Sequence, residues 1–338
     1  MKQHRTTVGM LTAISLLTLA VLGCRGLANP PDWTKGRKIA GSQQGLSHIS
    51  GLVVDEKFAY VTIGGTIADQ NAGTIGLRKV ALDSGEVTVL DDGLVNFTQS
   101  DRGGVAIDDK FIYWNAYGKI LRIPKAGGKP DVIASEHVGI GVDIVVDNEK
   151  IYWANHGYYS SNSPTRPSPV YCVPKQGGAT QIFADQQSIP SSLVVDEKFV
   201  YWVTPESIVK KAKSGGEPQV IFQASKEEGV DELGQDSESL YFGFRGAGKS
   251  RWALRQISKQ GGEPQTVAKT FTLGQIAADD TNIYFFDEHS VMKDDLCRVS
   301  KKGGEVARLD TGYASGIITQ GRTLIYFATL DDIYSFPK

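Results

Sequence analysis

An Asp that precedes a Tyr by five residues recurs six times along this chain, and Trp or Phe usually follows the Tyr. The pairs are Asp55–Tyr60, Asp108–Tyr113, Asp147–Tyr152, Asp196–Tyr201, Asp236–Tyr241 and Asp279–Tyr284. A seventh copy, at Gly321 and Tyr326, keeps the Tyr and loses the Asp. Successive Tyr residues are 53, 39, 49, 40, 43 and 42 positions apart. A period of about 40 residues built from strand-like segments is the signature of a β-propeller blade.

One repeat, residues 103–135, contains the pattern of four antiparallel strands. Residues 104–107 are an apolar run that suits a buried inner strand, and residues 108–110 form a tight turn. Residues 111–114 are β-branched and aromatic, and residues 119–123 alternate as a half-buried strand does. A Gly-Gly hairpin then leads into an outer strand at residues 131–134. We therefore predict an all-β chain of four-stranded antiparallel blades.

Two recurring phrases resemble binding motifs, but they are better interpreted as structure. The Tyr-Trp pairs are expected to fill the space between neighbouring blades rather than to stack on a ligand. The Lys-x-Gly-Gly phrases are expected to be hairpins, because no strand-to-helix context makes them phosphate loops. They occupy residues 125–128, 175–178, 213–216, 259–262 and 301–304, and residues 83–85 replace them in the first repeat.

The last repeat has only three strands, and the N-terminal part of the chain offers the fourth. The segment 36–40 resembles the outer strand at 131–134, so we expect it to pair with the C-terminal hairpin and close the ring. Closure removes the exposed blade edge that invites aggregation. Six complete blades and one shared blade make seven. A propeller of six or eight blades would require that one repeat has been misassigned. The first repeat is the first place to look for such an error, because the span from Tyr60 to Tyr113 is the longest.

The start of the chain has the features of a secretion signal. Lys2 and Arg5 precede a largely apolar stretch at residues 8–22, and Gly23 and Cys24 follow. Residues 21–24 resemble the bacterial lipobox, in which the Cys is lipidated and becomes the mature N-terminus. Arg25 follows it in place of the Asp that retains lipoproteins at the inner membrane, which favours the outer membrane. The alternatives are a plain signal peptide and an uncleaved anchor.

These features give a domain plan for the 338 residues. We expect a lipoprotein signal peptide at 1–23, a linker at 24–33 after the lipidated Cys, and one propeller at 34–338. A lipid anchor would hold the protein at a bacterial envelope membrane without spanning it. Cys172 and Cys297 fall in the third strands of repeats three and six, almost opposite on the ring. A disulfide needs Cα atoms within about 7 Å, so both are expected to be free, buried thiols.

The sequence of the repeats resembles that of known propeller families. Residues 107–114, Ile-Asp-Asp-Lys-Phe-Ile-Tyr-Trp, with residues 120–123, Ile-Leu-Arg-Ile, resemble the repeats of YWTD-type and TolB-like propellers. They look closest to bacterial lipoprotein propellers of this repeat type, which are mostly uncharacterised. The YWTD family has six blades and a Thr-Asp after the Trp, whereas Trp114 is followed here by Asn115 and Ala116. The resemblance implies a propeller fold and specifies no function.

Loop lengths indicate where a site would lie. Insertions concentrate between the second and third strands of the repeats, on the face that also carries the blade-to-blade connections. Function usually resides on variable loops held by a rigid scaffold, so ligand-binding residues are expected around the mouth of the central channel. The candidates are His48, Asp101, Arg102, Asp143, His156, Asp231, Glu232, Arg245 and His289.

Several function classes stay open, and none has a catalytic motif. A net charge of −2 gives no whole-chain attraction to nucleic acid. Asp287, Glu288 and His289, with Asp294 and Asp295, have metal-ligand atoms but not the spacing of a calcium loop or zinc pair. No catalytic residue, metal or cofactor is assigned.

The favoured hypothesis is a monomeric, lipid-anchored, non-enzymatic propeller that binds a protein or glycan partner. The first alternative is a hydrolase or lyase whose His and carboxylate side chains lie on the propeller axis and act with or without a bound metal. In that case His48, Asp143, Glu232 and His289 would converge on the axis. The second alternative is a purely structural envelope component.

Overall fold

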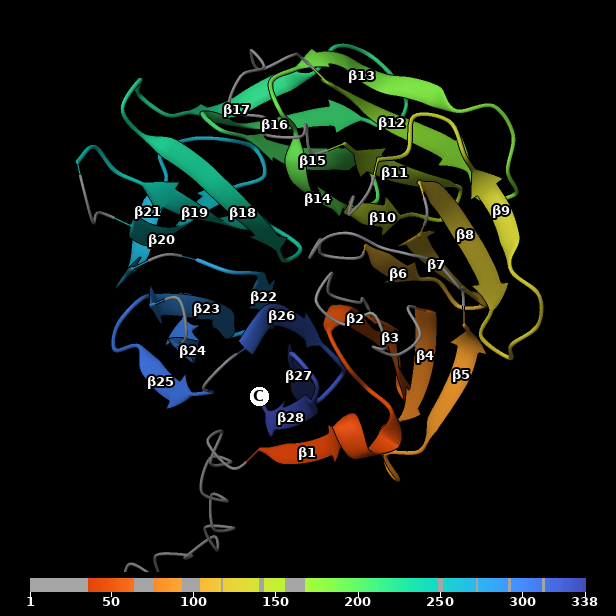
Figure 1. Cartoon of the computed structure of the whole chain (residues 1–338). Coiled ribbons are helices and arrows are strands. Elements are labelled where there is room, and N and C mark those ends of the chain that lie inside the picture. Colours follow the sequence, from red (N-terminus) through yellow and green to blue (C-terminus); the bar gives the residue numbers. More distant parts are fainter. Residues whose placement is uncertain are drawn as a thin grey trace, which may run out of the picture. The chain divides into compact units, whose positions relative to one another are not determined.

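Seven sheets of four antiparallel strands form a ring in the computed structural model (Figure 1). The structure describes residues 36–63, 76–92, 104–116, 118–139, 143–155, 168–248, 252–271, 273–290, 293–311 and 314–338. Over these residues the helical content is one 3₁₀ turn, η1 (Ser42–Gln44). The same residues contain no helix long and apolar enough to cross a membrane. The prediction of an all-β, seven-bladed propeller is confirmed.

Six blades take four consecutive strands from the inside of the ring outward, and the seventh combines the last three strands with the first one. The strands are β1 (Arg37–Ala40), β2 (Ile49–Val54), β3 (Phe58–Ile63), β4 (Gly76–Ala81), β5 (Val87–Asp91), β6 (Val105–Ile107), β7 (Phe111–Ala116), β8 (Lys119–Pro124), β9 (Asp131–Ala134), β10 (Ile144–Val146), β11 (Lys150–Ala154), β12 (Ser168–Pro174), β13 (Gln181–Gln187), β14 (Ser191–Val195), β15 (Phe199–Thr204), β16 (Ser207–Ala212), β17 (Gln219–Gln223), β18 (Gly229–Gln235), β19 (Ser239–Arg245), β20 (Trp252–Ser258), β21 (Gln265–Thr270), β22 (Ile276–Ala278), β23 (Asn282–Ser290), β24 (Lys293–Ser300), β25 (Ala307–Asp310), β26 (Ala314–Gln320), β27 (Leu324–Thr329) and β28 (Ile333–Pro337).

The N-terminal strand closes the ring as predicted. In the seventh blade the order is β1-β28-β27-β26, so β1 supplies the outer strand that the last repeat lacks. Arg37 lies opposite Ser335 and Lys38 opposite Tyr334 in the antiparallel register. Figure 1 shows β1 beside β28, with the two ends of the propeller in one blade. The remaining blades, β2–β5 to β22–β25, are the predicted meanders.

The apolar core is divided into seven clusters, and each joins two neighbouring blades. Tyr60 of the first blade packs in one cluster with Trp114 of the second. Tyr113 packs likewise with Trp153 of the third. The other Tyr residues do the same around the ring, ending with Tyr326 against the first blade. Burial of each large apolar side chain contributes about 1.5–3 kcal/mol, so the Tyr-Trp pairs are interface packing, as predicted.

The repeated Asp links its own turn, its own Tyr and the next blade. The Oδ1 atom of Asp108 accepts backbone N–H groups of Lys110 and Phe111, both at 2.8 Å. Its Oδ2 atom accepts the hydroxyl of Tyr113 at 2.8 Å and the Lys175 ammonium of the next blade at 2.6 Å. We call this three-residue arrangement a staple. Five staples are Asp55–Tyr60–Lys125, Asp108–Tyr113–Lys175, Asp147–Tyr152–Lys213, Asp196–Tyr201–Lys259 and Asp236–Tyr241–Lys301.

The staples lower the pKa of their Asp residues and raise the pKa of their Tyr residues. Burial alone would raise the pKa of Asp108, but the Lys175 ammonium and the turn N–H groups outweigh it and lower that pKa to about 2. The pKa of Asp236 is lowered to about 2 for the same reasons, with Lys301 as its cation. Burial, and then the hydrogen bond to Asp108, raise the pKa of Tyr113 above its ordinary value. The carboxylates are therefore held ionised and the phenols neutral.

The interface between the last and first blades, here called the seam, is built without a staple. Gly321 stands where the other blades have Asp, since its N–H bonds to Leu324 as that of Asp108 bonds to Phe111. Leu82 stands where they have Lys, and it packs in one apolar cluster with Tyr326. A Cβ atom on Gly321 would lie 2.7 Å from the Tyr326 ring. Arg37 ties the seam instead, donating to the carbonyl oxygens of Leu82 and Asp83.

The prediction of two free, buried thiols is also confirmed. Cys172 in β12 and Cys297 in β24 are both buried and unbonded to another sulfur. Burial raises the pKa of the Cys297 thiol to about 12. Because only the thiolate is an effective nucleophile, neither position favours covalent chemistry.

We expect the Asp108–Lys175 pair to be coupled. Asp108→Asn, Lys175→Met and the double variant should give a coupling free energy of about 0.5–3 kcal/mol in urea unfolding, because the pair shares one half-buried network. The control is the exposed Arg322–Glu56 pair, 3.5 Å apart with side chains 81% and 74% exposed. Its cycle should give a value close to zero. Equal coupling in both cycles would contradict the staple model.

Unfolding stability should be steady at neutral pH and fall in acid. Staple carboxylates have folded pKa values below their unfolded ones, so their contribution is present above the unfolded value of about 4. It is lost as the pH falls toward about 2, the folded pKa of Asp108 and Asp236. Chemical unfolding from pH 6 to pH 2 should show this decline, and Asp108→Asn should flatten part of it. A decline of the same size in the variant would remove Asp108 as a cause.

Candidate functional site

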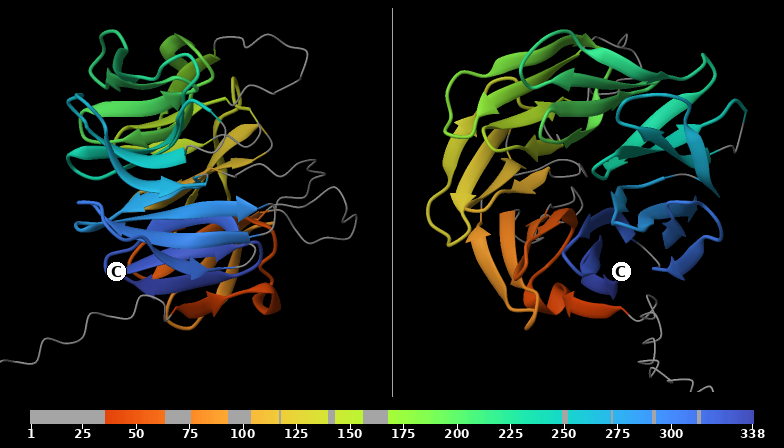
Figure 2. Two further views of the ribbon diagram at one scale, coloured as in Figure 1. Left: turned by 90° about the vertical axis from the view of Figure 1, so that its left-hand side faces the viewer. Right: turned by 180° about the vertical axis from the view of Figure 1, so that it is seen from behind.

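The two faces of the ring differ in what they carry. The hairpins β2–β3 and β4–β5, and their equivalents, carry the staples and form the staple face. In the edge-on view of Figure 2, the tight hairpins and the labelled C-terminus lie on one side of the ring. The opposite, long-loop face carries the β3–β4 type of connection and the links between blades. From strand to strand that connection takes two residues in the fourth blade and thirteen in the third.

A polar residue recurs at the start of the inner strands, four positions before the repeat Asp. Ser192 Oγ accepts the N–H of Leu233 in the next blade at 2.8 Å. Gln275 Oε1 accepts the N–H of Ile318 in the next blade at 3.2 Å. Asp143 and Glu232 occupy the same repeat position, and Glu232 is 9% exposed. These two candidates therefore stand where the fold uses a side-chain acceptor to connect neighbouring inner strands.

His48 lies at the seam, just before β2. Its N–H donates to Asp331 Oδ1 at 3.1 Å, and the next N–H, of Ile49, donates to the Leu330 carbonyl at 2.7 Å. Its backbone has a φ of +48°, which is uncommon outside Gly. Its Nδ1 atom is buried and has no hydrogen-bond partner among the described residues. The histidine thus belongs to the ring closure and leaves one buried ring nitrogen without a hydrogen-bond partner among the described residues.

Asp231 and Arg245 lie together in the fifth blade. Asp231 is exposed within β18, and its Oδ1 atom accepts the N–H of the next residue, Glu232, at 3.0 Å. Arg245, at the end of β19, is exposed and lies over Gly229, where an added Cβ would be 2.8 Å from Nη2. The long-loop face therefore presents an acidic and a basic side chain on one blade.

The other candidate positions fall outside what the structure describes. Asp101, Arg102, His156 and the lipidation candidate Cys24 lie outside the described residues. The backbone of His289 belongs to β23, but its side chain is outside the description. These assignments stay predictions.

The described candidates do not assemble a metal centre. In the described part of the chain, no group of three or more His, Cys, Asp or Glu could hold a metal ion. His48, Asp143 and Glu232 come from the first, third and fifth blades, and they form no such group. The geometry expected of an axial metal-assisted enzyme is therefore not found among these residues.

In the sixth blade, Asp287 and Asp295 of the candidate metal-ligand set form ion pairs with Arg308. Asp287 is completely buried, and its Oδ1 atom accepts the N–H of Phe271 at 2.7 Å. Its Oδ2 atom lies 2.6 Å from Arg308 Nη1, which is also 3.7 Å from Asp295. Burial lowers the pKa of Arg308, but the bond to Asp287 outweighs it and raises that pKa. Two carboxylates of the candidate metal set thus stabilise a cation from β25.

The sequence does contain a signal for Arg308. In four blades an exposed apolar residue of the outer strand pairs with the same repeat position of the third strand, as Val132 does with Leu121. These outer-strand residues are Val89, Val132, Ile182 and Val220. Arg308 occupies this position in β25. An Arg at a position that is apolar in four repeats marks an added interaction, but its partner is visible only in the structure.

Comparison with known proteins identifies the fold. No family model matches the chain, and no curated protein matches it well enough to count as a relative. The extracellular domain of a hybrid two-component system from B. thetaiotaomicron is similar, with 13% identity over 89% of this chain and 39% of that chain and a TM-score of 0.64. A puromycin-hydrolysing peptidase from Mycobacterium tuberculosis is similar, with 13% identity over 88% of this chain and 51% of that chain and a TM-score of 0.59.

A propeller from a nidogen/laminin complex is similar as well, with 17% identity over 70% of this chain and 91% of that chain and a TM-score of 0.50. The chain spans about two fifths of the two-component domain and about half of the peptidase. At these identities the likeness establishes the β-propeller architecture, and function must be argued from the residues.

Proposed function

We propose that this chain is a lipid-anchored protein of a bacterial envelope, and that its long-loop face binds a protein or glycan partner without catalysis. The anchor part of the proposal rests on the charged start, the apolar stretch 8–22 and the lipobox-like residues 21–24. The linker 24–33 would separate the lipid from the propeller, whose first described strand begins at Arg37.

The observation that carries the binding proposal is the unequal use of charge on the two faces. On the staple face, Asp and Lys residues of consecutive blades neutralise one another in five repeated pairs. On the long-loop face, connection lengths differ from blade to blade, and Asp231 and Arg245 are exposed. Variable loops on a rigid ring are the usual place for recognition. Mixed charges on such a surface suit a polar partner.

The solved propellers leave binding and catalysis equally open, since one is from a complex with laminin and another hydrolyses puromycin. Among the described residues, His48, Asp143 and Glu232 do not form a metal-holding group, which counts against the metal-assisted form of the enzyme alternative. A binding function requires no such convergence.

Cys24→Ser should release the protein from the membrane. Without a thiol at position 24 no acyl chain can be attached, and the protein should move from the membrane pellet to the soluble fraction on cell fractionation. Metabolic labelling with an alkyne fatty acid should mark the wild type and not the variant. An unlabelled wild type that stays in the pellet would favour the uncleaved anchor instead.

Partner capture should depend on the long-loop face. Cross-linking of the full-length protein in its own envelope should give a defined partner band that Asp231→Ala/Arg245→Ala weakens about tenfold or more, as loss of contacts at a binding site does. Glu197→Ala/Lys198→Ala, which removes one exposed charge of each sign from the staple face, should leave the band unchanged. Equal loss in both variants would contradict the assignment of the face.

The same preparation tests the enzyme alternative. Metal analysis and thermal unfolding with and without a chelator should show no stoichiometric metal and no change in melting temperature. A bound metal whose removal lowers the melting temperature would favour the metal-assisted enzyme alternative and direct mutagenesis to the channel mouth.

A further inference from the structure

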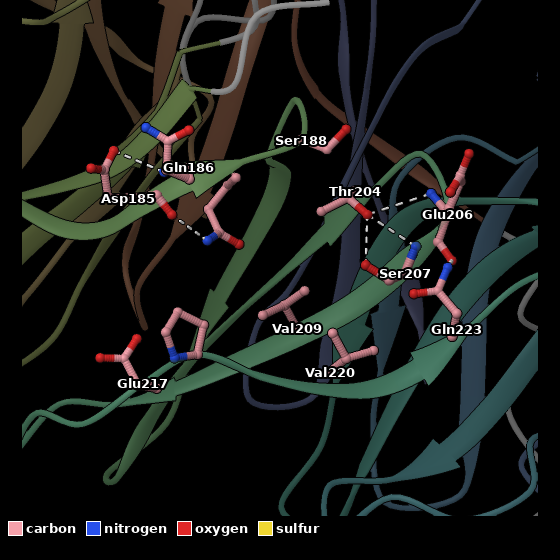
Figure 3. Close-up of a pocket in the computed structure, with 12 residues that line it drawn as sticks. Asp185, Gln186, Ser188, Thr204, Glu206, Ser207, Val209, Glu217, Val220 and Gln223 are labelled. Atoms are coloured by element: carbon pink, nitrogen blue, oxygen red, sulfur yellow. Dashed lines mark hydrogen bonds between the residues drawn. The ribbon is translucent and has the colours of Figure 1, made fainter.

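A groove of about 460 Å³ lies at the rim of the ring between the third and fourth blades (Figure 3). It is lined by the end of β13, the β15–β16 turn, parts of β16 and β17, and Glu217 and Pro218 of the β16–β17 hairpin, which lies toward the staple face. The end of β13 and the β15–β16 turn belong to the long-loop face. We call it the rim groove. None of the candidate residues predicted from sequence lines it.

The rim groove differs in charge from the two described grooves of the staple face. Those two grooves are lined by both acidic and basic residues, and the basic ones include Lys175 and Arg122 in one groove and Lys301 in the other. The rim groove has three carboxylates and no Lys or Arg in its lining. Lys211, on the neighbouring β16, is held over the ring of Phe183 at 5.3 Å. The groove therefore has an excess negative charge that the described residues do not neutralise.

The carboxylates are spread over the length of the groove. In Figure 3, Asp185 and Glu217 lie at one end and Glu206 lies at the other. Glu217 precedes Gln223 by six residues of extended chain, and Gln223 Nε2 donates to the Glu206 carbonyl at 3.1 Å. At about 3.3 Å per residue, the two ends are about 15–20 Å apart. One metal ion cannot bridge that span, and the described residues hold no compact acidic group of that kind.

The middle of the groove is apolar. Val209 and Val220 are direct partners in the β16–β17 ladder, so their side chains share one face of the sheet. Figure 3 shows both between the two acidic ends. Pro218 adjoins them in the lining. An aliphatic stretch of a ligand would lie here while its charged ends stay in water, as Lys and Arg side chains do on apolar surfaces.

The walls of the groove are fixed before any ligand binds. Thr204 Oγ1 and Ser207 Oγ are 2.7 Å apart, and the Ser207 N–H donates to Thr204 Oγ1 at 3.0 Å. Gln187 Oε1 accepts the indole N–H of Trp202 at 3.2 Å. These bonds hold the turn and the amides in place, which reduces the entropy that a ligand must overcome on binding.

We propose that the rim groove binds an elongated cationic ligand in which ammonium or guanidinium groups are joined by an aliphatic stretch. The cations lie against Glu206 at one end and Asp185 and Glu217 at the other, and the aliphatic part covers the exposed Val220, beside the buried Val209. Two sources share this chemistry, a free polyamine and basic side chains of a peptide segment. The inference rests on the proposed function, because the Glu206 end of the groove, at the β15–β16 turn, belongs to the face assigned to partner binding.

The test is calorimetric titration of the full-length protein in detergent, at physiological salt so that loose surface attraction is screened. The probes are spermine, butylammonium, and a blocked peptide with two Lys separated by four Val. Spermine or the peptide should bind, and butylammonium should bind at least tenfold more weakly because it reaches one end only. Glu206→Gln/Glu217→Gln should weaken binding at least tenfold.

The matched control is Glu197→Gln/Glu263→Gln. Glu263 follows Gly-Gly and precedes Pro in the fifth blade as Glu217 does in the fourth, and it is not part of the groove lining. The control should bind like the wild type. Binding of spermine alone assigns a free ligand, and binding of the peptide alone assigns a peptide-borne one; both support the proposal. Equal binding in the groove and control variants, or no binding of either probe, overturns it.

The outcome is separable from that of the proposed function. If neither probe binds while cross-linking still depends on Asp231 and Arg245, the groove proposal is wrong and the partner-binding function stands. If a probe binds through Glu206 and Glu217 while cross-linking is insensitive to the long-loop variants, the groove proposal stands and the partner assignment is wrong.

Discussion

The packing of one blade against the next is the interaction on which the rest of this structure depends. A single four-stranded sheet has two faces to cover, and in this ring each face is covered by a neighbour. The buried Tyr of one blade and the Trp or Phe of the next fill that space in six of the seven clusters, and at the seam Tyr326 meets Val61 instead. The apolar contact alone does not fix how the two blades are aligned. The staple does, because its Asp must meet a Lys at a fixed place on the following blade. The repeat length, the turn sequence and the register all follow from this one interface.

The seam shows what happens to that interface where chain continuity is broken. Gly321 and Leu82 come from opposite ends of the propeller, yet both staple positions are lost together, which is what a pairwise interaction requires. A Lys facing a missing Asp would be a half-buried charge without a partner, a costly arrangement. The Leu side chain joins the apolar cluster instead. Arg37 then connects the closing strand to the carbonyls of the first blade. His48, selected from the sequence as a site candidate, is held by Asp331 of the last blade and serves the same closure.

The fold was predictable because its causes are local and repeated. Alternation, turn residues and the Asp-to-Tyr spacing each occur within a dozen residues, and seven copies reinforce one another. The fourth strand of the last blade followed from the resemblance of 36–40 to 131–134. The site was less predictable because its contacts join residues distant in sequence. Nothing near Ser192 predicts that its hydroxyl accepts from Leu233, and Asp287 gives no local sign of Arg308. Polar residues that looked available for a ligand therefore proved to be structural acceptors in several cases.

The contrast between repeated residues that build the ring and residues that occur in one blade also explains why the strongest sequence pattern is a poor guide to function here. A charge that recurs from blade to blade is set by the ring and is neutralised within it in the five staples, as Asp108 is by Lys175. Recognition must use residues that depart from the repeat, because only these give one blade a surface that the others lack. Glu217 illustrates the point. Its Gly-Gly-Glu-Pro phrase recurs at Glu263, yet only in the fourth blade does that phrase border a groove with Asp185 and Glu206. The identity of a residue is then less informative than its neighbours from the adjacent blade, and the search for function belongs at the blade interfaces of the long-loop side.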